Sequence, residues 1–245
     1  MKRRLETLDT LRGAAVVSMV LFHLAYDVFV IFGGDYSWTQ GTLVTLWQRS
    51  ICFTFIIVSG FVWSYGRRKA LKRGLFLTAV GMAVTAVTAV FMPDVAIYFG
   101  VMSFFGCAVI LMIPAEKVLR RVPAAAGAVL SLFAFFLTEY ASYGAVKLFG
   151  HTLFRLPGVL YASNIGVPFG FPPRSFVSAD YYPIIPWMFL YFFGYFLWRL
   201  FAHRPITEKL GHLDVPVLTS IGRHAVAIYV FHQPLCYVLC MLVCC

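Results

Sequence analysis

Long apolar runs constrain this chain more than any other feature of its sequence. A helix needs roughly 20 apolar residues to cross the hydrocarbon core of a bilayer. Helices are favoured there because every backbone polar group in lipid must be bonded internally. The sequence therefore predicts an all-α, polytopic membrane helix bundle of about seven transmembrane helices, forming a single domain over 1–245. The runs lie near 10–32, 42–65, 75–92, 96–114, 123–140, 183–201 and 219–243.

The composition agrees with a membrane protein. Of the 245 residues, 61% are hydrophobic and 12% are charged, whereas about a quarter of the residues of soluble domains are charged. The net charge of +10 comes from short basic clusters between the apolar runs, which indicates membrane topology rather than a nucleic-acid partner. We expect membrane lipids as partners and no nucleic acid, and assembly into a homo-oligomer is compatible with the sequence.

The basic residues also predict an orientation. If the N-terminus is cytoplasmic, the clusters at 2–4, 67–73, 117–121 and 199–209 all fall on the cytoplasmic side, and the opposite loops receive only Lys147, Arg155 and Arg174. This bias follows the positive-inside rule and predicts a C-terminus outside. The segment 141–182 then lies outside as well. It is rich in Gly, Pro and aromatic residues, so we expect no ordinary span there; it either covers or enters the mouth of the bundle, or rests on the headgroups.

The first apolar run carries three polar side chains on one predicted helix face. Arg12 and His23 are eleven residues apart, and Asp27 follows one turn later. Charged groups at a helix centre cost roughly 2.5–3.5 kcal/mol on insertion scales and therefore mark sites or buried pairs. Histidine exchanges protons near neutral pH, and a carboxylate one turn away can orient its ring. We expect His23 and Asp27 to be catalytic, but Asp27 can instead pair with Arg49 of the second run.

The last run contains a second polar group. Arg223 and His224 should lie near the cytoplasmic surface, with His232 and Gln233 near the middle of the membrane. Pro234 removes a backbone hydrogen bond and should kink the helix beside them. This pattern indicates a wall of a polar cavity. We expect no metal site, because the spacing of the candidate ligands along the chain gives only a weak indication of metal binding.

Four motifs resemble a known family. They are LDTLRGAAVVSMVLFH, FTFIIVSGF, YYPIIPWMFLYFFGYFLWR and GRHAVAIYVFHQP. In this order they resemble the bacterial relatives of the heparan-alpha-glucosaminide N-acetyltransferase catalytic domain, and the first, the SGF and the HQP segments are also similar to the acyltransferase-3 family. The resemblance implies an acyl-CoA-dependent O- or N-acyltransferase in the bacterial cytoplasmic membrane.

The resemblance also implies substrates and residue roles. Acetyl-CoA or another acyl-CoA is the cytoplasmic donor, and the acceptor is an extracytoplasmic glycan, lipid or small molecule. His23 is then the catalytic residue and Arg12 binds the donor. Further basic residues suited to the donor phosphates are Arg67, Arg68, Lys72, Arg73 and Arg223. Polar or aromatic residues expected to bind substrate or to have a structural role are Arg49, Ser59, Ser103, Tyr182, Trp187, His224, His232 and Gln233.

Two features leave alternatives open. Relatives carry a polar His or Gln in the fourth-run motif where this chain has FGVMSFFG, so a second catalytic role at Ser103 is in doubt. A proton-coupled transporter is the alternative function, because His23, Asp27 and His232 could form a proton relay. Against transport, the runs show no inverted repeat of the kind that many secondary transporters have.

Overall fold

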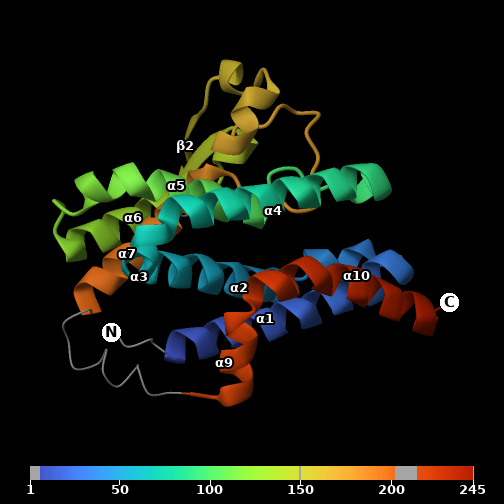
Figure 1. Ribbon diagram of the computed structural model, residues 1–245. Helices are drawn as coiled ribbons and strands as arrows, with labels where there is room; N and C mark the ends of the chain where they lie inside the picture. The colour runs from blue at the N-terminus through green and yellow to red at the C-terminus, as the bar shows by residue number, and fades with distance from the viewer. Residues whose placement is uncertain (1–5, 149, 202–213, 245) are drawn as a thin grey trace. The chain divides into compact units, whose positions relative to one another are not determined.

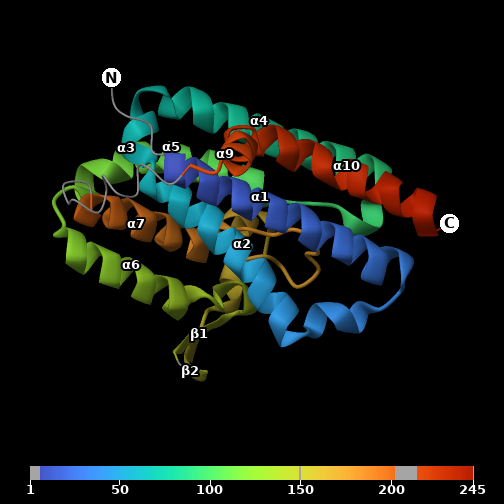
Figure 2. The same ribbon diagram turned by 90° about the horizontal axis from the view of Figure 1, so that it is seen from below.

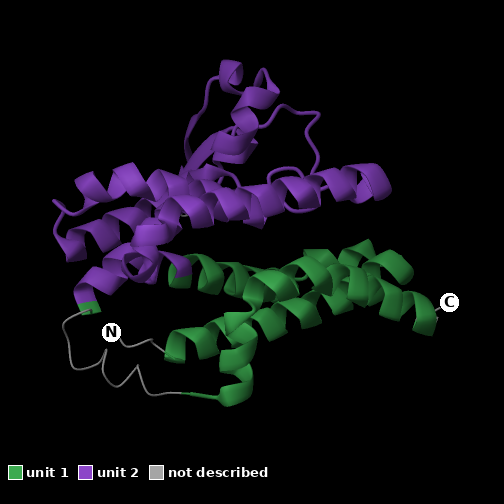
Figure 3. Ribbon diagram, viewed as in Figure 1, with its two compact units in different colours: residues 1–58, 201–245 green, residues 59–200 purple. Residues whose placement is uncertain are grey.

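The computed structural model describes residues 6–148, 150–201 and 214–244. The chain divides into two compact units, one of residues 1–58 with 201–245 and the other of residues 59–200 (Figure 3). We call these unit 1 and unit 2. The predicted basic cluster at 2–4 and the basic residues Arg204 and Lys209 lie outside the described part of the chain.

The mostly helical fold with seven candidate membrane spans is confirmed within the described residues. The spans are Glu6–Phe32, Thr42–Phe61, Trp63–Phe91, Val101–Leu119, Ala124–Tyr143, Ile184–Phe201 and Ala225–Val243. Several boundaries differ from the sequence prediction. The third span begins at Trp63 rather than near 75, because a short α-helix at Trp63–Gly66 and a 3-10 turn at Arg67–Lys69 lead directly into the helix that begins at Ala70. The fourth begins at Val101 rather than near 96, after a turn in which Phe99 has a positive φ of 56°.

Unit 1 is built around its first helix. α1 (Glu6–Tyr26) continues into a π-helical turn, η1 (Asp27–Phe32), and is followed by η2 (Tyr36–Gln40) and α2 (Thr42–Phe61). The end of the chain forms α9 (Pro216–Arg223) and α10 (Ala225–Cys244), which both pack against α1. The short α9 runs crosswise to α1 and α10 (Figures 1 and 2). The single predicted run 219–243 is therefore corrected to two helices that meet at His224. α10 continues through Pro234.

Two glycines let α1 and α9 touch backbone to backbone. A Cβ atom at Gly13 would lie 1.9 Å from the carbonyl oxygen of Leu218, and one at Gly222 would lie 1.9 Å from that of Asp9. A hydrogen bond of 2.7 Å between the hydroxyls of Thr10 and Thr219 ties the same two helices together. Small residues permit such close crossings. The two glycines and the hydroxyl contact hold α9 against the N-terminal half of α1.

α2 is tied to α1 on another face. The indole nitrogen of Trp47 donates to the hydroxyl of Ser18 at 2.8 Å. Met19, Phe22 and Ile51 form a buried cluster nearby, against which Trp47 and Tyr229 pack. Side chains of α1, α2 and α10 therefore enclose the middle of α1 in apolar surface.

Unit 2 contains the remaining long helices. They are α3 (Trp63–Gly66), α4 (Ala70–Phe91), α5 (Val101–Leu119), α6 (Ala124–Thr138) and α7 (Ile184–Phe201), with the short turns η3 (Arg67–Lys69) and η4 (Pro93–Val95). α4 and α5 approach closely because a Cβ at Gly81 would lie 2.4 Å from the hydroxyl of Ser103, and one at Gly106 would lie 2.2 Å from that of Thr78. Buried aromatic side chains, among them Phe104, Phe135 and Phe196, fill the core of this unit.

The segment between α6 and α7 holds a small sheet that the sequence analysis did not predict. After η5 (Ala141–Tyr143), β1 (Ala145–Leu148) and β2 (His151–Arg155) form an antiparallel hairpin, followed by η6 (Gly158–Tyr161) and η7 (Asn164–Phe169). Among the residues that the structure describes, the seven candidate spans lie outside residues 144–183, where the sequence also predicts no ordinary span. Strands this short carry little periodic signal, which is why the hairpin was missed.

Hydrogen bonds tie the end of this segment to the beginning of α5. A carboxylate oxygen of Asp180 accepts from the backbone nitrogen of Val101 at 3.0 Å, and the backbone nitrogen of Tyr182 donates to the carbonyl of Phe99 at 3.0 Å. The phenol of Tyr181 donates to the carbonyl of Val167 at 2.5 Å. Burial raises the pKa of the Tyr181 phenol, so it stays a neutral donor at physiological pH.

Arg199 caps the end of a neighbouring helix. Its guanidinium donates to the carbonyls of Leu119 and Val122, each at 2.8 Å, and to that of Arg120 at 3.3 Å. These carbonyls belong to the last turn of α5 and the residues after it, where no intrahelical donor is available. A cation there also interacts favourably with the helix dipole. From the sequence alone, Arg199 indicated only membrane topology.

We predict that Gly13→Ala destabilises the protein. The new methyl group would overlap the carbonyl of Leu218 and push α9 away, at a cost of about 1–3 kcal/mol. Thermal denaturation of the purified protein in detergent should show a clearly lower Tm. Gly158→Ala is the matched control, because nothing lies within 4 Å of a Cβ at Gly158. Equal Tm values for the two variants would contradict the close helix contact.

We also predict that Arg199→Leu lowers the Tm. The substitution removes the guanidinium donor from the carbonyls of Arg120 and Val122, at a cost of about 1–3 kcal/mol. The carbonyl of Leu119 still accepts from the backbone nitrogen of Val122. Arg155→Leu on the exposed strand β2 removes the same charge and should change stability by less than about 0.5 kcal/mol. If the two variants lose the same stability, charge rather than capping accounts for the effect.

Candidate functional site

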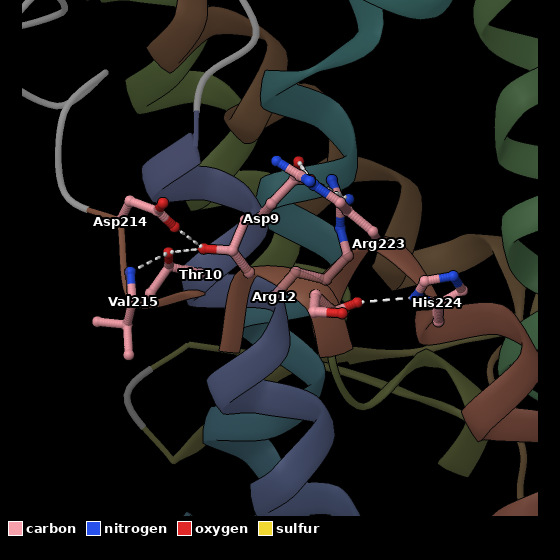
Figure 4. Close-up of polar contacts among 9 residues, drawn as sticks. Asp9, Thr10, Arg12, Asp214, Val215, Arg223 and His224 are labelled. Atoms are coloured by element: carbon pink, nitrogen blue, oxygen red, sulfur yellow. Dashed lines mark hydrogen bonds and ion pairs between the residues drawn. The ribbon is translucent and has the colours of Figure 1, made fainter. Parts of the chain in front are cut away.

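A buried carboxylate gathers two arginines near the N-terminal end of α1 (Figure 4). Nη1 of Arg12 lies 2.9 Å from Oδ1 of Asp9, and Nε of Arg223 lies 3.8 Å from Oδ2. The side chain of Asp9 is 7% exposed, whereas those of Arg12 and Arg223 are 23% and 41% exposed. In the described part of the chain, two guanidiniums therefore approach one carboxylate, and both arginine side chains keep exposed surface. We call Asp9, Arg12 and Arg223 the arginine pair site.

Hydroxyl contacts hold α9 beside this site. The hydroxyl of Thr219 bonds that of Thr10 and donates to Oδ1 of Asp214 at 2.5 Å. The backbone nitrogen of Val215 donates to the hydroxyl of Thr10 at 3.4 Å, and both residues are labelled in Figure 4. The beginning of α9 is therefore fastened to α1, which keeps Arg223 near Asp9.

Two histidine rings meet deeper in unit 1. The rings of His23 on α1 and His232 on α10 are 4.7 Å apart between centroids and nearly perpendicular, at 75°. Nδ1 of His23 lies 2.8 Å from the carbonyl oxygen of Met19, and Nδ1 of His232 lies 2.7 Å from that of Tyr229. A carbonyl only accepts hydrogen bonds, so each Nδ1 carries the hydrogen. In the neutral ring, the lone pair is then on Nε2.

Asp27 meets Gln233 rather than either of its predicted partners. Nε2 of Gln233 donates to Oδ1 of Asp27 at 2.8 Å. The expected contact of Asp27 with His23 or Arg49 is therefore corrected for the residues that the structure describes. Asp27 begins the π-helical turn, so its side chain leaves the regular α-helical stripe on which the expectation relied. Turns of this kind occur frequently at functional sites.

The predicted basic cluster on unit 2 is partly occupied by partners within that unit. Nε of Arg67 lies 2.9 Å from Oε2 of Glu116, whose side chain is 7% exposed. The guanidinium of Arg73 covers Gly66, where a Cβ would lie 2.1 Å from it. Arg68 and Lys72 are exposed, as is the neighbouring Lys69, so these cations are accessible to an anion.

The other predicted residues of unit 2, Ser59, Ser103, Tyr182 and Trp187, are buried or half-buried. Ser103 is buried in the contact between α4 and α5, while Ser59 is half-buried near the end of α2. The ring of Trp187 lies 4.8 Å from that of Tyr182 and 5.5 Å from that of Phe135, in an aromatic cluster of unit 2.

Two predicted residues of unit 1 are exposed. Nδ1 of His224 lies 2.9 Å from the carbonyl oxygen of Ser220, where α9 ends (Figure 4). Arg49 is exposed on α2. Of the predicted site residues, unit 1 therefore brings together three pairs: Arg12 with Arg223, His23 with His232, and Asp27 with Gln233.

Asp9 is the site residue that the sequence analysis missed. Its signal was present, because an acidic residue three positions before an arginine on a helix predicts an ion pair. Among the described residues, no group of three or more His, Cys, Asp or Glu side chains could hold a metal ion.

Comparison with known families agrees with the four motifs. The family model described as heparan-alpha-glucosaminide N-acetyltransferase, catalytic, matches residues 4–234. Searches of the curated proteins and of the solved structures give no match. The matched family implies a membrane acetyltransferase that uses acetyl-CoA. The match spans nearly the whole chain and confirms the predicted resemblance: the protein belongs to the heparan-alpha-glucosaminide N-acetyltransferase catalytic-domain family.

Proposed function

We propose that this protein transfers an acyl group, most simply acetyl, from cytoplasmic acyl-CoA to an amine or hydroxyl of an extracytoplasmic acceptor such as a cell-envelope sugar. His23 is the catalytic residue of this proposal. The contact of His23 with His232 is the observation that supports this role. Two imidazole rings whose centroids are 4.7 Å apart in apolar surroundings form a proton-transfer site. Their apolar neighbours include Phe22 and Tyr229, whose rings lie 5.7 Å from those of His23 and His232 respectively.

The tautomer of His23 suits this role. With Nδ1 donating to the carbonyl of Met19, Nε2 has the free lone pair. An imidazole nitrogen in this state can remove the proton of the acceptor or accept the acyl group itself. Either route needs the ring held still, and the backbone hydrogen bond supplies that restraint without a carboxylate.

The arginine pair site supports donor binding at the predicted cytoplasmic end of α1. Arg12 and Arg223 keep exposed guanidinium surface although both lie near Asp9, and guanidiniums bind phosphate through charge-assisted hydrogen bonds. Arg12 precedes His23 by eleven residues, or roughly 16 Å of helix. Phosphates held near Arg12 would let the thin arm of acyl-CoA extend along α1 toward His23.

Other parts of the proposal follow from the sequence. Arg67, Arg68, Lys72 and Arg73 are further candidates for donor phosphates, and Arg68 and Lys72 are both exposed. The basic clusters favour a cytoplasmic N-terminus and an external C-terminus in a bacterial cytoplasmic membrane. The multi-pass character itself follows from the seven candidate spans of the described chain.

A proton-coupled transporter is the second candidate. The neighbouring rings of His23 and His232, with the fully buried Asp27 also in unit 1, could pass protons through a membrane. Family membership favours acyl transfer. Uptake into proteoliposomes that depends on a pH gradient and needs no coenzyme A would reverse this preference.

We predict that His23→Ala abolishes acyl transfer. Loss of a general base or nucleophile should lower the rate of coenzyme A release from acetyl-CoA by about 100-fold or more. The assay uses purified protein with a broad panel of amines, sugars and lipids as acceptors. His151→Ala, on the exposed strand β2, is the matched control and should keep the wild-type rate. Equal activity of the two variants would remove His23 from the mechanism.

We predict that Arg12→Ala weakens donor binding and leaves the chemistry intact. Losing a charge-assisted hydrogen bond to phosphate should raise the KM for acetyl-CoA about tenfold, with little change in kcat, as expected for a purely binding residue. In this variant Arg223 still lies beside Asp9, so the buried carboxylate keeps a cation nearby and the fold should persist. Arg155→Ala is the matched control. An unchanged KM would show that the donor phosphates bind elsewhere.

A further inference from the structure

Three hydrogen-bond acceptors are buried in unit 1 near the histidine contact. They are Oδ2 of Asp27, Oε1 of Gln233 and Nε2 of His232, and each has no hydrogen-bond partner among the described residues. Asp27 is 0% exposed and His232 is 6% exposed. A buried polar atom without a partner costs roughly 1–3 kcal/mol. Three such atoms around one contact between α1 and α10 need an explanation.

The hydrogen bonds that are present determine the role of each atom. The amide nitrogen of Gln233 must face Asp27, because a carboxylate accepts, so Oε1 of Gln233 is left to accept from another group. Nδ1 of His232 is used by the carbonyl of Tyr229, so Nε2 is an acceptor in the neutral ring. The free atoms are thus all acceptors, and one belongs to a carboxylate. An anion does not suit this set, whereas a group that carries N–H or O–H hydrogens does.

We propose that Asp27 and Gln233 bind the nucleophilic N–H or O–H group of the acceptor, and that His232 takes its proton during transfer. This inference rests on the proposed acyl transfer and adds a subsite to it. His232 is the base because its Nε2 is buried with no other partner and its ring contacts that of His23, the proposed catalytic residue. Asp27 orients the amide of Gln233, and the π-helical turn at Asp27 holds the carboxylate toward α10.

The proposed step balances. The nitrogen or oxygen of the acceptor forms a bond to the acyl carbon. The bond from that carbon to its carrier, Nε2 of His23, breaks with its electron pair. His23 has earlier taken the acyl group from the sulfur of coenzyme A, which left as the thiolate. The acceptor proton moves to Nε2 of His232. His232 later releases this proton, which matches the proton that the coenzyme A thiolate takes up to leave as the thiol.

Replacing His232 tests the base directly. Protein in nanodiscs is assayed for coenzyme A release from acetyl-CoA, with glucosamine as the amine probe and glucose as the hydroxyl probe. His232→Ala should lower acceptor-dependent release about 100-fold and leave the KM for acetyl-CoA unchanged. Added imidazole should restore part of the lost rate, which a merely structural role would not allow. His151→Ala is the control.

Replacing Asp27 tests the subsite by a different readout. Asp27→Asn keeps an oxygen for Gln233 but replaces the free carboxylate oxygen with an amide NH2 group. This new donor cannot accept from the N–H or O–H group of the substrate, while the shape of the side chain hardly changes. The KM for the acceptor probe should rise about tenfold or more, and the KM for acetyl-CoA should not change. Asp94→Asn, at an exposed position in unit 2, is the matched control.

The outcomes separate this inference from the proposed function. If the wild type releases no coenzyme A with any amine, sugar or lipid acceptor, acyl transfer is wrong and the subsite with it. If the wild type is active but Asp27→Asn leaves the acceptor KM unchanged, the subsite is wrong and acyl transfer stands. The same holds if His232→Ala keeps wild-type activity. Should His232→Ala fail to fold, as judged by its elution profile, Asp27→Asn decides alone. A preference for glucosamine identifies the bound group as an amine, and one for glucose as a hydroxyl.

Discussion

The backbone contact between α1 and α9 is the constraint on which the rest of unit 1 depends. Gly13 and Gly222 remove the side chains that would keep these helices apart, and the hydroxyls of Thr10 and Thr219 then come within hydrogen-bonding distance. The contact between α1 and α9 brings Arg223 close to α1, although about two hundred residues separate Arg223 from that helix in the chain. Without this contact, Arg223 could not reach Asp9, whereas Arg12 lies only three positions from Asp9 on the same helix.

Polar groups in this unit are arranged as two sites of opposite character. The arginine pair site has an excess of positive charge and partly exposed donors, which suit an anion. The histidine contact, with Asp27 and Gln233, presents buried acceptors that suit a donor-bearing group. A transferase needs such a pair of environments, one for a phosphate-rich donor and one for a nucleophile. α1 contributes residues to both, so its length sets the distance between them.

Much of the fold was predictable from hydropathy, because a membrane span can be recognised by its length and composition. His23 and His232 stood out for the same reason, as protonatable residues inside apolar runs. The partners of Asp27 were not predictable. Helical periodicity describes the faces of one helix, and it holds only while the helix stays regular; the π-helical turn at Asp27 breaks that regularity. The break between α9 and α10 at His224 was missed because the hydropathy of the run 219–243 does not show where the chain changes direction.

The sequence by itself determined the class of protein, the number of candidate spans and the polar residues that lipid would not tolerate alone. The four motifs also placed the chain in its family. Only the tertiary structure decided the partners: Arg12 and Arg223 with Asp9, His23 with His232, and Gln233 with Asp27. The physical reason is that composition and periodicity are local properties of a segment, whereas a hydrogen bond between residues 206 positions apart depends on how two helices pack.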